Sequence, residues 1–117
     1  MEIKNNHETK VEKSYCILID KTYDNLAWPS HIDEEGMLLY LKTMQHYCNE
    51  LLRCGGSLTL KEVCLILNVS YKKEWYNVGW MYDEYTFVDF GLDKHLLNPF
   101  MHGFDKILLS FNAQELW

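Results

Sequence analysis

The sequence predicts an α+β fold, in which one long and one short helix pack on a small antiparallel sheet. Three observations lead to this prediction. Apolar residues follow a helical period between residues 30 and 54, a helix-capping pattern opens a short apolar run at residue 59, and β-prone runs occupy most of the second half. Because all three share one short chain, we expect their apolar faces to meet in a single core.

The long helix is predicted to begin after Ser30 or Asp33 and to run to about Cys54. Its apolar positions recur at steps of three and four residues: Met37, Leu41, Met44, Cys48 and Leu51. Polar residues fall on the other side of the helix: Lys42, Gln45, Asn49, Glu50 and Arg53. Gly55 and Gly56 supply the left-handed stop. The pattern covers about two heptads, which is short for a coiled coil, so it favours packing on a core over a dimer seam.

The short helix has a clear start signal. Thr59 and Glu62 have the Thr-x-x-Glu spacing of a capping box, in which each side chain satisfies a backbone N–H of the other. We therefore predict a buried helix from Leu60 to Leu67, ended by Asn68. Before the long helix, the segment Tyr23 to Pro29 is expected to be a loop anchored by Leu26 and Trp28.

Four β-prone runs complete the prediction. Ser14 to Ile19 is a short strand, Val78 to Tyr82 and Thr86 to Phe90 form a hairpin around residues 83–85, and Ile107 to Phe111 is a further strand. In that last strand Ile107, Leu109 and Phe111 share one face. Residues 1–13 are polar and without period, so we expect a flexible arm followed by a single domain over residues 14–117.

The charge balance restricts the class of partner. The chain of 117 residues carries 17 carboxylates and 11 basic side chains, and only one of the latter, Arg53, is an arginine. Guanidinium groups are the usual bidentate ligands of phosphate, so this composition argues against a nucleic-acid partner. The start of the sequence lacks a secretory signal, and no apolar run approaches the roughly 18 residues of a membrane span. We therefore expect a cytosolic protein with no membrane partner.

Sequence motifs for catalysis are missing. The sequence contains no Gly-rich phosphate loop and no His-Glu-x-x-His motif, and its four cysteines form no Cys-x-x-Cys pair. We expect no catalytic residue, no cofactor and no metal, with Cys16, Cys48, Cys54 and Cys64 as free thiols. The carboxylates around the predicted hairpin could perform acid–base chemistry in a small hydrolase: Asp83, Glu84, Asp89 and Asp93. Their roles as turn formers and solubilising charges are the favoured interpretation.

Two resemblances to known families compete. Gly55 to Asn112 contains, in order, Gly-Gly-Ser-Leu-Thr-Leu-Lys-Glu-Val, Val-Gly-Trp-Met-Tyr, Phe-Val-Asp-Phe-Gly-Leu and Ile-Leu-Leu-Ser-Phe-Asn. This order resembles small uncharacterised phage and prophage proteins of Gram-positive bacteria, and the resemblance implies a mobile-element origin. Ser110 stands where an Asp is common in those proteins.

The second resemblance covers only Leu58 to Ser70. It is similar to the first helix and turn of excisionase-like helix-turn-helix domains, which implies a recognition helix starting at Ser70. The following residues, Tyr-Lys-Lys-Glu-Trp-Tyr, contain two lysines and no arginine that could read guanine.

Aromatic residues near the predicted hairpin are the remaining candidates for a site. Tyr and Trp anchor interfaces because they offer a large rigid area with a polar tip. We predict a partner-binding surface made of Trp75, Tyr76, Tyr82, Asp83, Glu84, Tyr85 and Asp89. The alternative is that these rings complete the core.

The expected function is that of a non-enzymatic phage or prophage accessory protein that binds a basic protein partner. A concrete version is an anti-CRISPR-like inhibitor of a host defence nuclease. A small helix-turn-helix DNA-binding regulator is the first alternative, and a small hydrolase using the hairpin carboxylates is the second.

Overall fold

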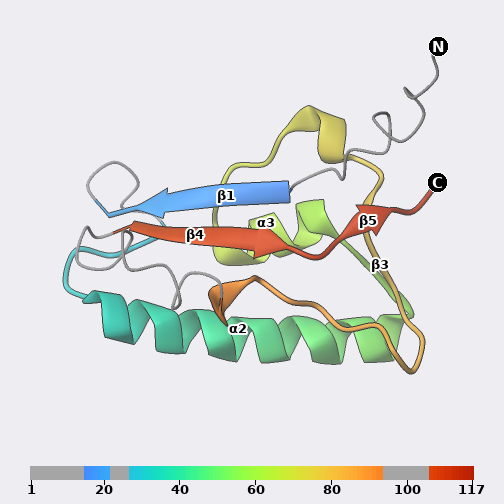
Figure 1. Cartoon of the computed structure of the whole chain (residues 1–117), viewed down its shortest axis with the longest axis horizontal. Helices are drawn as coiled ribbons and strands as arrows, with labels where there is room; N and C mark the ends of the chain where they lie inside the picture. Colours follow the sequence, from blue (N-terminus) through green and yellow to red (C-terminus); the bar gives the residue numbers. More distant parts are fainter. Residues whose placement is uncertain (1–14, 22–26, 94–105) are drawn as a thin grey trace, which may run out of the picture.

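The computed structural model describes residues 15–21, 27–93 and 106–117, and in them the chain has the predicted α+β fold (Figure 1). The predicted N-terminal arm, Leu26 and most of the connection that precedes the last long strand lie outside the described residues. The elements in chain order are β1 (Tyr15–Asp20), α2 (Glu34–Gly55), β2 (Ser57–Thr59), α3 (Leu60–Leu67), the 3-10 helix η1 (Lys73–Trp75), β3 (Val78–Met81), β4 (Lys106–Phe111) and β5 (Gln114–Glu115).

The prediction of the long helix is confirmed to within one residue at its end. Asp33 is the N-cap of α2, and its carboxylate accepts a hydrogen bond from the backbone N–H of Gly36 at 2.8 Å. Gly56 ends the helix with a φ of 85°, and its N–H donates to the carbonyl of Leu52. The apolar stripe faces inward, with Met37, Leu41, Cys48 and Leu52 buried.

The short helix α3 is also confirmed in detail. Both halves of the capping box are present: Thr59 accepts from the N–H of Glu62, and the Glu62 carboxylate accepts from the N–H of Thr59. Asn68 ends the helix in the left-handed conformation, with a φ of 62°. Local signals therefore determine both ends of both helices.

The strands form two antiparallel sheets. β1 pairs with β4 over their whole lengths, from Tyr15 opposite Phe111 to Asp20 opposite Lys106. β3 is the central strand of the other sheet, between β2 and β5. α2 lies along one side of the molecule, and the β1–β4 pair lies on the opposite side, roughly along the same direction (Figure 1). Ile107, Leu109 and Phe111 share the buried face of β4, as their alternation predicts.

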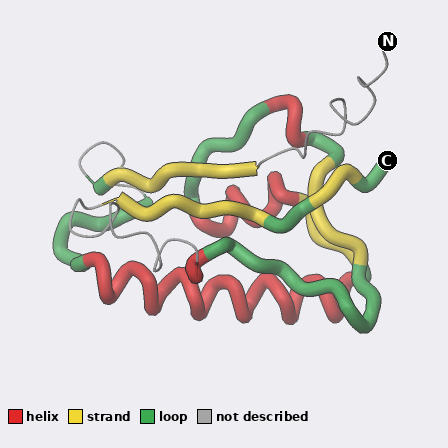
Figure 2. The backbone as a smooth tube through the Cα atoms, viewed as in Figure 1, coloured by secondary structure: helices red, strands yellow, loops and turns green. Residues whose placement is uncertain are grey.

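The predicted hairpin is wrong in its second strand. Residues 82–91 form an extended loop that passes between α2 and β4 (Figure 2), and Thr86 to Phe90 pair with no strand in a ladder. The reason is that both edges of β3 are already occupied, by β2 at Leu58 and by β5 at Gln114. The loop instead follows β4, where Phe90 accepts a backbone hydrogen bond from Ser110 at 2.8 Å.

The second helix of a helix-turn-helix does not form after Ser70. Residues 70–77 contain a single turn of 3-10 helix, η1, and the chain then enters β3. In the structure, the likeness to that motif is thus limited to its first helix, α3.

One hydrophobic core joins the two helices and both sheets. Trp28, Trp80 and Phe90 are its largest fully buried aromatic side chains. The expectation that Trp28 anchors its loop is confirmed, and its indole N–H donates to the carbonyl of Ile32 at 2.7 Å. Neither helix in the described part of the chain is long and apolar enough to cross a lipid bilayer.

Candidate binding surface

Two side-chain amides on α2 hold the loop that replaces the predicted strand. The Asn49 side chain binds both backbone groups of Val88, as a neighbouring strand would. Its Oδ1 accepts from the Val88 N–H at 2.7 Å, and its Nδ2 donates to the Val88 carbonyl at 3.0 Å. One turn earlier, Gln45 Oε1 accepts from the N–H of Phe90 at 2.8 Å. These two polar residues therefore face the loop and are half-buried, whereas the sequence placed them on the polar side of the helix.

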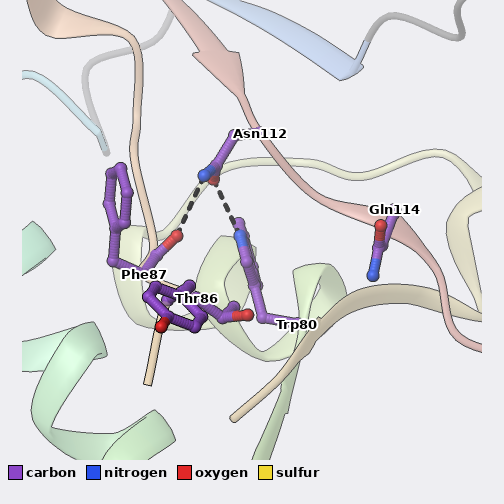
Figure 3. A pocket seen from close by; sticks show the side chains of 6 residues that line it. Trp80, Thr86, Phe87, Asn112 and Gln114 are labelled. Atoms are coloured by element: carbon purple, nitrogen blue, oxygen red, sulfur yellow. Dashed lines mark hydrogen bonds between the residues drawn. The ribbon is translucent and has the colours of Figure 1, made fainter. Parts of the chain in front are cut away.

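Asn112 holds the same loop from its other side. Its Oδ1 accepts from the Trp80 indole N–H at 2.7 Å and from the Asp89 N–H at 2.9 Å, and its Nδ2 donates to the Phe87 carbonyl at 2.9 Å (Figure 3). One side chain thus connects β3 and the loop to the link between β4 and β5. The second half of the loop is extended but fixed, because side chains bind the N–H groups of Val88, Asp89 and Phe90 and the carbonyls of Phe87 and Val88.

A tight turn presents the tip of the loop. The Asp83 carboxylate accepts from the Tyr85 N–H at 2.7 Å, and the Asp83 carbonyl accepts from the Thr86 N–H. The hydrogen bond from the Tyr85 backbone, followed by that from the Thr86 hydroxyl, lowers the pKa of Asp83 below its usual value. This carboxylate is therefore ionised at neutral pH, next to the most exposed aromatic side chain of the loop.

Large apolar side chains project into solvent from this loop and from the end of β3. Tyr85 is 83% exposed and Phe87 is 55% exposed, with Met81 and Tyr82 about half exposed beside them. We call these four residues together with Asp83 and Glu84 the aromatic loop surface. The sequence identified Tyr82 and Tyr85 but missed Met81 and Phe87. The signal for Phe87 was its alternation with Val88 and Phe90, both of which are buried.

Two predicted members of the site lie elsewhere. Trp75 is a core residue: only 6% of it is exposed, and its ring packs edge-on against Tyr15 at 5.9 Å between centroids. Tyr76 is exposed but contacts Trp117, at 6.4 Å between centroids. The prediction that one surface joins Trp75 to the loop is therefore incorrect, because η1 turns its tryptophan into the core.

The Asp89 carboxylate also has a structural contact. Its Oδ1 accepts a hydrogen bond from the N–H of Gly91 at 2.8 Å, which fixes the turn that leads out of the loop. Within residues 15–21, 27–93 and 106–117, no three His, Cys, Asp or Glu side chains come together in a way that could hold a metal ion. Two of the four carboxylates of the predicted hairpin, Asp83 and Asp89, thus accept hydrogen bonds within turns, as the favoured interpretation expects.

A small pocket opens beside the aromatic loop surface. Its volume is about 190 Å³, and it is lined by Trp80, Tyr85, Thr86, Phe87, Asn112 and Gln114. Asn112 lies above the Trp80 indole, with Phe87 and Thr86 to one side and Gln114 to the other (Figure 3). The pocket brings together β3, the loop and β5, which are separated by up to about thirty residues of sequence, so sequence reasoning did not find Asn112 or Gln114.

Comparison with protein families gives one match. Residues 2–117 match the model of a family of unknown function, DUF6353, and the chain belongs to this family. Neither the curated proteins nor the solved structures contain a match to the chain.

Proposed function

We propose that this member of DUF6353 binds a protein partner through the aromatic loop surface. The observation that carries this proposal is the exposure of four large apolar side chains, one at the end of β3 and three on the loop that Asn49, Gln45 and Asn112 hold in place. An exposed apolar cluster of this kind is typical of an interaction site.

The rigidity of the loop favours binding. Ordering an interface loop and its side chains opposes association, so a surface that is already ordered loses less free energy when the partner arrives. Tyr85 and Phe87 have few rotatable bonds, and their rings supply a large contact area for a small loss of conformational entropy. These are properties of side chains that dominate interface energetics.

The charge of the loop favours a basic partner. Residues 81–93 contain Asp83, Glu84, Asp89 and Asp93, and no Lys, Arg or His. Arg53, near the end of α2, forms an ion pair with Glu50 at 2.7 Å, and this pair offsets its positive charge. A basic surface on the partner would be steered toward the loop, and the association rate would fall as salt is added.

The finer version of the proposal follows from the resemblance to phage and prophage proteins. A phage or prophage accessory protein of this size could inhibit a host defence nuclease, in the manner of an anti-CRISPR protein, by placing carboxylates and aromatic rings in its basic nucleic-acid groove. In this version of the proposal the protein has no enzymatic activity and acts in the cytosol.

Quantitative affinity capture from a Gram-positive bacterial lysate tests the proposal. The immobilised chain is compared with Tyr85→Ala and Glu84→Lys, both at exposed positions of the loop. We expect at least one protein to be retained by the unmodified chain and reduced about tenfold or more by each substitution, because truncation of an interface anchor commonly costs 2 kcal/mol or more.

Tyr40→Ala is the matched control. Tyr40 is also a partly exposed tyrosine, but it lines a different cavity, together with Ala27 and Pro29. Capture of the same protein should be unchanged by this substitution. If Tyr85→Ala and Glu84→Lys retain every protein that the unmodified chain captures, the aromatic loop surface is not the binding site.

A further inference from the structure

We infer that the pocket beside the aromatic loop surface receives the guanidinium group of an arginine side chain. This inference rests on the proposed function, since the arginine would belong to the protein partner. The juxtaposition that carries it is the Trp80 and Tyr85 rings, the Gln114 amide, which has no partner among the described residues, and the neighbouring Asp83 carboxylate.

The aromatic rings form the apolar part of the pocket. Trp80 is only 2% exposed and lies at the base, while Tyr85, which is 83% exposed, lies at the rim. Phe87 lines the pocket too, but its ring points away from the Trp80 indole (Figure 3). A cation that lies over the face of a Trp, Tyr or Phe ring is attracted by the negative charge at that face. The pocket volume of about 190 Å³ suits one side chain better than a larger ligand, since drug-sized ligands occupy cavities of roughly 300–1,000 Å³.

The polar atoms of the pocket differ in what they can still bind. The Trp80 N–H and both side-chain atoms of Asn112 are already used in hydrogen bonds to each other and to the loop. The Gln114 side chain, in contrast, has no hydrogen-bond partner among the described residues, so no group within them competes with a ligand for its Oε1. Asp83 adds negative charge close by, because its carboxylate holds the N–H of the pocket residue Tyr85 at 2.7 Å.

These features favour arginine over lysine. The guanidinium is planar, stacks on aromatic rings, carries five N–H donors in a fixed fork and is more weakly hydrated than an ammonium group. It can therefore lie against a ring and donate to Gln114 at the same time. None of the six residues that line the pocket is basic, so nothing within the lining repels the incoming charge.

Titration of the full ¹⁵N-labelled chain with N-acetyl-arginine amide tests the inference. The reporters are the indole N–H of Trp80 and the side-chain amide of Gln114, followed at low salt. N-acetyl-citrulline amide is the control ligand, because its ureido group has nearly the shape of guanidinium without the charge. We expect the arginine amide to shift both reporters in a saturable way, and the citrulline amide to bind at least several-fold more weakly.

Three variants should change the affinity for the arginine amide in predictable directions. Gln114→Glu should bind the arginine amide more tightly, Gln114→Leu more weakly, and Tyr85→Ala about two- to fivefold more weakly, as loss of one exposed cation–π contact implies. Tyr40→Ala, at the other cavity, should bind as the unmodified chain does. Equal binding of the arginine and citrulline amides, or equal affinities of the two Gln114 variants, would overturn the inference.

Failure of the inference and failure of the proposed function give different results. If capture of a lysate protein depends on Tyr85 and Glu84 but the arginine amide leaves Trp80 and Gln114 unshifted, the arginine pocket is wrong and the binding surface stands. If the arginine amide binds but neither Tyr85→Ala nor Glu84→Lys reduces the capture of any lysate protein, the proposed protein-binding function is wrong for this surface.

Discussion

At the scale of single residues, Asn112 determines the shape of the candidate site. Its side chain makes three hydrogen bonds, of which one satisfies the indole N–H of buried Trp80. We expect Asn112→Ala to lower the free energy of unfolding by about 1–3 kcal/mol, because a buried donor then loses its partner. Urea unfolding followed by tryptophan fluorescence measures this loss.

Gln114→Ala is the matched control for that measurement. Gln114 lines the same pocket, but its side chain makes no hydrogen bond within the described residues. Its removal should change the free energy of unfolding by less than about 0.5 kcal/mol. Equal stabilities of Asn112→Ala and the unmodified chain would show that the three hydrogen bonds are not needed to hold the loop.

At the scale of elements, the close pairing of β2 and β3 depends on Gly79. A Cβ atom at this position would lie 2.2 Å from the backbone oxygen of Leu58 and 2.7 Å from the Cα of Thr59. Backbone atoms cannot rotate away, so we expect Gly79→Ala to separate the strands and to lower the free energy of unfolding by about 1–3 kcal/mol. Chemical denaturation measures the change.

Gly55→Ala should raise the free energy of unfolding in the same experiment. Gly55 is the last residue of α2, and a Cβ atom there would have no neighbour within 4 Å. Alanine should stabilise the chain by about 0.4–1 kcal/mol, because it restricts the unfolded state without straining the helix. If Gly79→Ala were as stable as Gly55→Ala, the pairing of β2 with β3 would have to be looser than the structure describes.

The helices and the loop also show which sequence signals are sufficient to predict an element and its ends. Three of the four helix ends are predicted to within a residue, and for the start of α2 the structure selects Asp33 over Ser30. These ends are predictable because Asp33, Gly56, Thr59 and Asn68 act on their own neighbours in the chain. The alternation of Thr86 to Phe90 correctly predicts extended backbone with alternate residues buried. Alternation does not specify the hydrogen-bonding partner, however, and here the partners are side-chain amides of α2 and Asn112 rather than a strand.

The candidate site could be predicted only for the residues that are adjacent in the sequence. Tyr82, Asp83, Glu84 and Tyr85 follow one another in a turn, so their exposure could be expected from turn-forming residues. Trp75 could not be separated from them by residue type, since a tryptophan serves equally in a core and in an interface. The pocket requires the β3–β5 pairing, and a two-residue strand leaves almost no pattern in a sequence.

At the scale of the whole molecule, the buried cysteines test whether the two sheets and two helices unfold together. Cys48 on α2 and Cys64 on α3 belong to the same hydrophobic core. Burial raises the pKa of Cys48 to about 11 and the pKa of Cys64 to about 12, so both are thiols at neutral pH, whereas the thiolate is the form that reacts. Both thiols should therefore resist alkylation in the folded chain.

Pulses of iodoacetamide at increasing urea concentration, read by peptide mass spectrometry, follow each thiol separately. Exposed Cys54 should be modified without urea and serves as the internal reference. We expect Cys48 and Cys64 to become reactive together, at the midpoint of the fluorescence transition, because one core unfolds as one cooperative unit. Modification of Cys64 at urea concentrations that leave Cys48 protected would contradict the single domain predicted for residues 14–117. It would show that α3 opens independently of α2.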